Sequence, residues 1–282
     1  MLQRTRTISD DRAAHDFAAN RARGLVELSV HRAAGRTRRR LVHETGSLRV
    51  RFPSPESDAL SAVLINTAGG VAGGDQFAVR LHAEDNSALL VTTAAAEKIY
   101  RSHGPAAQLD VSLRVDAGGR IAWLPQETIL FDGASLERRI DLDLAEKASL
   151  LCAEIVVFGR TAMKERLRRG RYIDRWRLRL AGRLAFAETI RLEDEIAATL
   201  ERHAVAAAGV AVATVLVVPG DEALVGRVRE AMPEISCEWG LSAWNGFALA
   251  RFCGMDAAQL RNAVIAMLKI IDPESLPRLW LN

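Results

Sequence analysis

The stretch SAVLINTAGGVAGGDQFAVR, residues 61–80, holds the feature around which the rest of the chain is organised. Two short apolar segments flank a loop in which four glycines occupy six positions and Asp75 follows directly. The four glycines are Gly69, Gly70, Gly73 and Gly74. Glycine at this density indicates backbone with positive φ, or backbone that lies too close to another group to leave room for a Cβ.

The glycine loop does not match the known nucleotide motifs. A Walker loop ends in Gly-Lys-Ser/Thr, whereas Asp75 and Gln76 follow Gly74, and a carboxylate repels phosphate. The Rossmann spacing is absent, and residues 77–81 alternate like a strand where that motif would start a helix. We interpret the loop as a hairpin-type connection whose glycines relieve strain. A Gly-loop enzyme acting on a phosphorylated or acidic small molecule is the alternative hypothesis.

The composition of the sequence and its lack of targeting signals indicate a globular cytoplasmic protein. The 282 residues are 49% hydrophobic and 26% charged, which is ordinary for a folded domain. No apolar run is long enough for a signal peptide or a membrane span, so no membrane partner is expected. Cys152, Cys237 and Cys253 are far apart and form no C-x-x-C pair, so they suggest neither a disulfide framework nor a thiolate zinc site.

Residues 1–24 form a polar, basic arm. Residues 1–40 contain ten arginines and four acidic residues, so this part of the chain has a formal charge of +6 while the whole protein has +3. The basic cluster lacks interleaved aromatic residues and any nucleic-acid-binding motif. A solvated strand edge or a patch for an acidic protein partner is therefore favoured over a nucleic-acid contact, which remains the weaker alternative.

The body of the chain, residues 25–282, is predicted to be one domain that is β-rich over residues 25–200. The segment 150–158 is apolar on both faces, which is typical of a central strand covered on both sides. Strands are expected at 25–30, 41–52, 62–65, 77–81, 89–93, 109–115, 121–124, 140–144, 150–158, 176–180, 184–192 and 210–218.

Residues 201–282 form a small α/β portion with two helices. Residues 221–232 have helical composition. Residues 256–271 place apolar side chains at three- and four-residue spacing between an N-cap at Asp256 and a stop at Asp272-Pro273. The residues thus predict a mainly β protein with two helices in its C-terminal third.

Three carboxylates fall on apolar strand faces. Glu188 shares a face with Phe186 and Ile190, Asp75 has the parity of Phe77, and Glu154 lies within LLCAEIVVF. A buried carboxylate is costly unless it is paired, hydrogen-bonded or bound to a cation. Each of the three is therefore expected either to pair with an arginine or to line a hydrophilic path or a cation site in the protein interior.

The conventional catalytic sets are missing from the sequence. The six histidines form no i, i+4 pair of a zinc helix, and there is no G-x-S-x-G elbow. An acid–base pair such as Glu127 with Asp132 stays an open alternative, because such pairs are brought together only by the fold.

Several ordered motifs together resemble one family, the urease accessory protein UreD, also called UreH. The matches cover roughly residues 25–282. They are NTAGGVAGGDQF (66–77), TTAAAEKIYRS (92–102), WLPQETILFDGA (123–134), FGRTAM (158–163) followed by Gly170 and Asp174-Arg175-Trp176, and LPRLW (276–280).

The resemblance implies a maturation factor that is not an enzyme. Such proteins bind the urease apoenzyme and UreF, which carries the GTPase UreG, so that nickel reaches the urease active site. The implied fold is an irregular, β-helix-like structure with two helices near the C-terminus, without a tightly bound cofactor and with nickel only in transit.

The resemblance also gives the inward carboxylates a shared purpose as a nickel route. The expected route residues are Asp75, Glu154, Glu188 and Glu97, the last beside Lys98. The family commonly has glycine before the glutamate that follows FGRTAM, whereas Lys164 precedes Glu165 here, so no metal role is carried over to Glu165.

Overall fold

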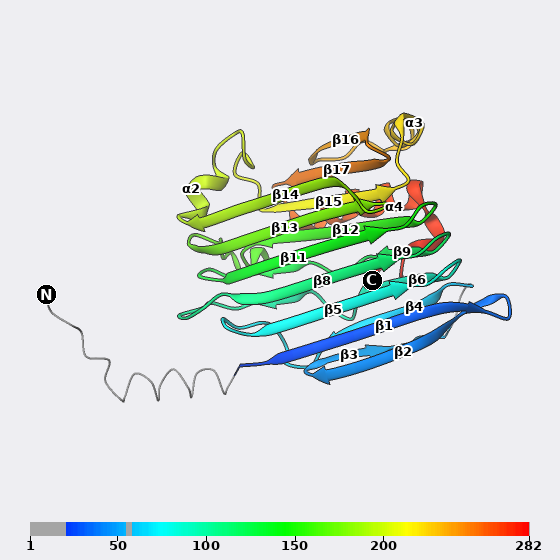
Figure 1. Ribbon diagram of the computed structural model, residues 1–282. Coiled ribbons are helices and arrows are strands. Elements are labelled where there is room, and N and C mark those ends of the chain that lie inside the picture. Colours follow the sequence, from blue (N-terminus) through cyan, green and yellow to red (C-terminus); the bar gives the residue numbers. More distant parts are fainter. Residues whose placement is uncertain (1–20, 55–57, 282) are drawn as a thin grey trace, which may run out of the picture.

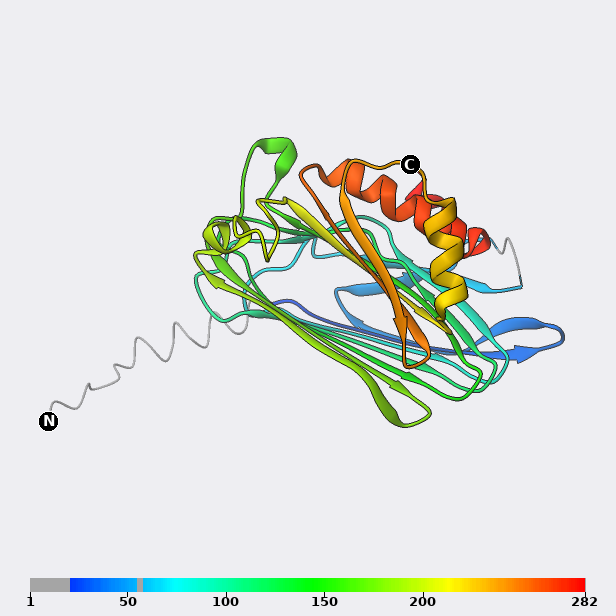
Figure 2. The same ribbon diagram turned by 90° about the horizontal axis from the view of Figure 1, so that it is seen from above.

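The computed structural model describes residues 21–54 and 58–281, which form two stacked β-sheets with helices on one outer face (Figures 1 and 2). Within these ranges one sheet has seven strands and the other has ten. Residues 1–20 of the predicted basic arm lie outside the described part of the chain. The first strand begins at Arg23, so the last two residues of that predicted arm belong to the sheet.

The seven-stranded sheet, sheet A, has the order β14-β13-β11-β8-β5-β1-β2. Its strands are β1 (Arg23–Ala33), β2 (Arg36–Gly46), β5 (Gln76–Ala83), β8 (Ala107–Val115), β11 (Ser135–Leu144), β13 (Gly170–Leu180) and β14 (Arg183–Asp194). The β1–β2 and β13–β14 pairs at its two ends are antiparallel, and the pairs between them are parallel.

The ten-stranded sheet, sheet B, has the order β16-β17-β15-β12-β9-β6-β4-β3, and β10 joins β12 to β7 beside this path. Its strands are β3 (Leu48–Arg51), β4 (Leu60–Asn66), β6 (Ala88–Thr93), β7 (Glu97–Ile99), β9 (Arg120–Trp123), β10 (Thr128–Leu130), β12 (Ser149–Phe158), β15 (Ala211–Val218), β16 (Glu238–Trp244) and β17 (Phe247–Gly254).

The central part of the chain winds as a two-layer solenoid. From β4 to β13 the longer strands alternate between the sheets, and each joins its predecessor in the same sheet in parallel. Figure 2 shows the two layers edge-on. The β-helix-like arrangement that the family resemblance implies is confirmed.

Strand β12 explains how the layers stack. Its side chains are buried along both faces, as its sequence predicts. Leu150 and Cys152 join the core between the sheets, whereas Leu151 and Ala153 join a second core beneath the helices. A strand with both faces covered places any polar side chain that it carries in one of these two cores.

Helices α3 (Glu222–Ala231) and α4 (Ala257–Ile271) cover the outer face of sheet B (Figure 2). The short helix α2 (Ile196–Leu200) follows β14 and contributes to the core between the sheets. The 3-10 turns are η1 (Thr161–Met163), η2 (Pro273–Ser275) and η3 (Arg278–Trp280). The predicted helices correspond to α3 and α4, whose N-caps Asp221 and Asp256 accept hydrogen bonds from backbone N–H groups. The single-turn helix α2 was not predicted.

The hairpin of β16 and β17 was not predicted from the sequence. Asn245 and Gly246, both with positive φ, connect its strands. Asn-Gly is a strong hairpin signal because both residues tolerate this conformation. Among the described residues, no helix combines the length and the apolar content needed to cross a bilayer.

Candidate functional site

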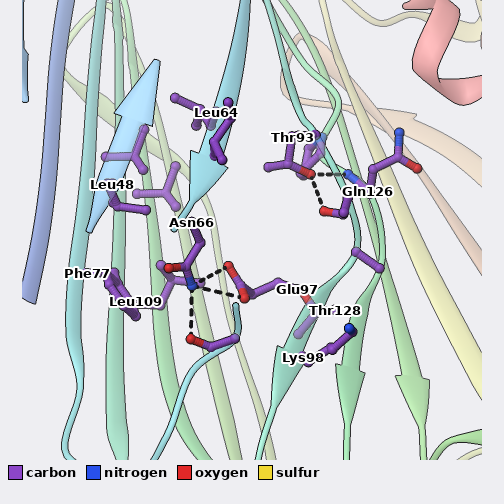
Figure 3. Close-up of a pocket in the computed structure, with 18 of the residues that line it drawn as sticks. Leu48, Leu64, Asn66, Phe77, Thr93, Glu97, Lys98, Leu109, Gln126 and Thr128 are labelled. Atoms are coloured by element: carbon purple, nitrogen blue, oxygen red, sulfur yellow. Dashed lines mark hydrogen bonds between the residues drawn. The ribbon is translucent and has the colours of Figure 1, made fainter. Parts of the chain in front are cut away.

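A cavity of about 230 Å³ lies between the two sheets, where β4, β6 and β9 end. Its wall is largely apolar, with Leu48, Leu64 and Phe77 among the lining side chains (Figure 3). The exposed residues of the lining define its mouth: Gly69, Ala94, Ala95 and Lys98. Buried polar residues define its inner end: Arg138 and Glu154.

Glu97 lies in the wall near the mouth. The Nδ2 of Asn66 lies 3.2 Å from each carboxylate oxygen of Glu97 and also donates to the carbonyl of Gly70 (Figure 3). Burial raises the pKa of Glu97 to about 7, although Asn66 and the backbone N–H of Lys98 favour its ionised form. Glu97 is thus poised between its neutral and charged forms at neutral pH.

Glu154 closes the inner end of the cavity. It projects from β12 into the space between the sheets, where the Trp123 indole N–H donates to one carboxylate oxygen at 2.7 Å. The Arg138 guanidinium, from β11 of the opposite sheet, donates to the other oxygen at 2.6 Å. Burial raises the pKa of Glu154, and Arg138 and Trp123 offset part of that shift.

Arg138 also binds a second carboxylate. It donates twice to Asp174 on the neighbouring strand β13, at 2.9 and 2.7 Å, and Tyr172 and Trp176 donate to the same carboxylate. Burial opposes ionisation of Asp174, yet these partners hold its pKa below the usual value. The inner cluster of Arg138, Asp174 and Glu154 therefore has one more carboxylate than it has guanidinium groups.

Asp75 lies outside the cavity wall and organises the glycine loop. Its buried carboxylate accepts the backbone N–H of Ala22 at 2.9 Å and that of Ala72 at 2.7 Å. The first contact fixes the entry to β1, and the second closes the loop on itself. The charge of Asp75 nevertheless acts on the cavity, since it contributes to the raised pKa of Glu97.

The glycines of the loop lie against neighbouring groups. A Cβ on Gly70, whose φ is +152°, would lie 2.4 Å from the Tyr100 ring, and one on Gly73 would lie 1.8 Å from the Ser102 hydroxyl. Gly69 and Gly74 also have positive φ. Close packing and backbone geometry account for these four residues.

The loop has little backbone left for binding an anion. The N–H groups of Ala68, Gly69, Val71, Ala72 and Asp75 all donate to partners within the protein. A phosphate cradle needs free N–H groups that converge on one point. The glycine loop is therefore built as a packed corner.

Glu188 lies apart from the cavity, at the edge of sheet A. It forms an ion pair with Arg251 on β17 and so links the neighbouring edges of the two sheets. Its side chain is 32% exposed, because β14 is an edge strand and is covered on one face only in part. Glu188 thus lies on the inward face, as its parity predicts, but its side chain is less buried than expected.

Both residues of the acid–base alternative form ion pairs. Glu127 lies 2.6 Å from Arg261 of α4, and Asp132 lies 2.6 Å from Arg168. Within the part of the chain that the structure describes, no group of three or more His, Cys, Asp and Glu side chains is arranged to hold a metal ion.

The structure brings Glu97 and Glu154 into one cavity, and the parity of the strands contained a further signal that was missed. Arg138 has the parity of the buried Ile140 and Leu142, so the test that identified the carboxylates would also have identified this arginine. Asn66 gave no comparable signal, because it becomes a partner of Glu97 only when the glycine loop folds against β7.

Fold and cavity together define the class of this protein as a β-solenoid scaffold that encloses a small carboxylate-bearing cavity. The family model described as "UreD urease accessory protein" matches residues 22–281. The chain therefore belongs to the UreD family, as its motifs indicate.

Curated relatives agree with this assignment. The chain is 60% identical to "Urease accessory protein UreD" of Rhodopseudomonas palustris strain HaA2, over 94% of this chain and 95% of the relative. It is also 60% identical to the protein of the same name from Bradyrhizobium diazoefficiens, over 94% and 96% of the two chains. A third relative, "Urease accessory protein UreD 3" of Bradyrhizobium sp. strain BTAi1, is 59% identical over 96% and 97%.

Proposed function

We propose that this protein is a maturation scaffold that binds the urease apoenzyme and UreF, and through UreF the GTPase UreG. Nickel is its cargo, and the cavity between the sheets forms part of the nickel route. The names of the relatives, which are accessory proteins of urease, support the accessory role.

The observation that carries the proposal is the pair of carboxylates within one cavity. Glu97 lies near the mouth, and Glu154 lies at the inner end beside Arg138. Because Arg138 is shared between Asp174 and Glu154, one guanidinium faces two carboxylates, and the inner end of the cavity attracts a cation.

The chemistry suits transport. Oxygen ligands hold nickel less tightly than imidazole or thiolate groups, so sparse carboxylates allow the ion to move on. A carboxylate with a raised pKa exchanges a proton for an arriving cation, so the cavity need not keep a permanent buried charge. Asp75 supports this route because it holds the glycine loop in place and because its charge contributes to the raised pKa of Glu97. The transport role expected for Glu188 stays a prediction.

Co-purification with the urease apoenzyme and UreF, followed by metal analysis of the urease, tests the proposal. The protein should be recovered in a complex with both partners, and urease from a strain lacking it should contain little nickel and be inactive. Fully nickel-loaded urease in that deletion strain would overturn the proposed function.

A further inference from the structure

The segment between β12 and β13, residues 160–169, forms a basic loop that the transport proposal leaves unused. Its sequence RTAMKERLRR contains five basic residues and one acidic residue. Figure 2 shows the loop in green, projecting beyond the sheets at the end away from α3. We call residues 160–169 the basic loop.

Internal contacts fix the shape of the basic loop. The Asp132 carboxylate accepts the backbone N–H groups of Arg168 and Arg169 at 2.9 and 3.2 Å, and it also accepts the Arg168 side chain at 2.6 Å. Glu165 pairs with Arg160 and accepts the backbone N–H of Asp132.

Two further features hold the basic loop in place. Leu167 is buried with the core between the sheets. Gly159 enters the loop with φ +104°, and a Cβ there would lie 2.4 Å from the carbonyl oxygen of Glu165. A loop ordered by its own protein loses little conformational entropy when it binds a partner.

The same contacts leave a specific set of side chains free. Met163 is 72% exposed, and Lys164 and Arg166 beside it are also exposed. Lys164 and Arg166 form no ion pair within residues 21–54 and 58–281, whereas Glu165 and Asp132 are already paired. The tip therefore combines one large apolar side chain with two unneutralised cations.

We propose that the basic loop is a docking element for a protein partner whose contact surface is an apolar pocket rimmed by carboxylates. Met163 fills the pocket, and Lys164 and Arg166 pair with the rim. Methionine adapts to apolar surfaces, and complementary charge selects the partner and speeds its association. A nucleic acid fits less well. Proteins that bind single strands stack bases on aromatic rings, but the Phe131 ring is already covered by the Arg160 guanidinium at 4.5 Å. The apolar tip also has no counterpart on a phosphate backbone.

The position of the loop connects docking with the cavity. Strand β10 pairs with β7 on one side and with the end of β12 on the other, so only β10 separates Glu97 from the strand that leads into the loop. Neighbouring strands lie about 4.8 Å apart. A partner held by the basic loop is therefore close to the cavity mouth, and in this respect the inference rests on the proposed function.

Binding measurements with two purified probes, the urease apoenzyme and the UreF–UreG complex, test the inference. The basic loop should contact one of these two probes. Met163→Asp and the double variant Lys164→Glu/Arg166→Glu should each weaken the binding of that one probe by about tenfold or more. Binding of that probe by the wild-type protein should also weaken with added salt, and the double variant should lose most of this salt dependence.

Matched controls lie toward the far end of the β13–β14 hairpin, about 23–30 Å from the start of β13 at roughly 3.3 Å per residue. Leu184→Asp changes an exposed apolar side chain, and Arg177→Glu/Arg179→Glu reverses two exposed charges. These variants should bind both probes within about twofold of the wild type. The urea midpoint of every variant is measured in parallel, and loop substitutions at exposed positions should leave it unchanged.

The outcomes separate the two proposals. Wild-type protein that binds neither probe would overturn the proposed function itself. Wild-type binding that the loop variants retain, or that the control variants lose equally, would overturn the docking role alone. Loss of binding to duplex DNA in the loop variants, with both protein probes still bound, would also contradict it.

Discussion

Replacing Glu97 with glutamine tests whether the Glu97 carboxylate is as poorly hydrated as its burial in the cavity wall indicates. The carboxylate is held against the wall by Asn66 at 3.2 Å, and glutamine keeps its size and one acceptor oxygen. The substitution therefore removes the ionisation of Glu97 while it leaves the packing almost unchanged.

The magnitude follows from the shift in pKa. The pKa of Glu97 rises from 4.5 to about 7 on folding, and each unit corresponds to about 1.4 kcal/mol. Between these two values the folded protein binds more protons than the unfolded chain, so the free energy of unfolding falls as the pH rises through this window. The full penalty above pH 7 is about 3 kcal/mol, and it vanishes below pH 4.5.

The glutamine variant has no such penalty. Its advantage over the wild type should be about 2–3 kcal/mol larger at pH 8 than at pH 5. Urea unfolding at the two pH values measures this difference, and contributions from other titrating groups cancel between the two proteins. Glu146→Gln, in the exposed turn before β12, is the control and should show the same small effect at both pH values.

A pH-independent difference between Glu97→Gln and the wild type would refute the reasoning. It would mean that Glu97 ionises as an exposed carboxylate does, and that water fills the mouth.

Three further predictions concern the packing of the protein, and urea unfolding tests each of them. Arg138→Leu should destabilise the protein by about 3–5 kcal/mol, because it leaves Glu154 buried without its counter-charge. Gly70→Ala should cost about 3 kcal/mol, since its Cβ would meet a neighbouring ring, whereas Gly69→Ala, with open space around it, should cost about 1 kcal/mol for its positive φ alone. Trp280→Ala should cost about 3–5 kcal/mol, because this buried side chain holds the C-terminal segment against sheet B.

These three results have distinct contradicting outcomes. A neutral Arg138→Leu would show that the cluster between the sheets is hydrated. Equal effects at the two glycines would show that backbone conformation, and not the neighbouring ring, fixes the loop. A small loss at Trp280 would show that the last turn contributes little to the fold.

Local patterns predicted most of the fold because its strands carry strong local signals. The alternation at residues 109–115 and the doubly apolar run at 150–158 each specify a strand and its covered faces, and both strands are present. Strands β7 and β10 have only three residues each. Strand β10 forms because β12 provides a neighbour at the right place, and β7 forms because β10 does. Short strands of this kind depend on long-range pairing, which local periodicity does not reveal.

The candidate site was predictable in its residue types but not in its grouping. Parity identified Glu154 as inward, and the structure places it in the core between the sheets. Parity gave the same answer for Glu188, whose edge strand leaves it partly exposed and paired with Arg251. Which inward carboxylates share a cavity depends on the order of strands in two sheets, and that order is a property of the whole fold.

The nickel content of urease matured in the presence of a Glu97→Ala variant tests the central claim most directly. Urease is isolated from a deletion strain that carries the wild-type protein, Glu97→Ala, or the control Glu137→Gln from the outer face of β11, and complex formation with UreF is measured alongside. We predict that Glu97→Ala assembles the complex but leaves urease depleted of nickel, while the control restores full nickel content. Normal nickel content with Glu97→Ala would contradict a route through the cavity.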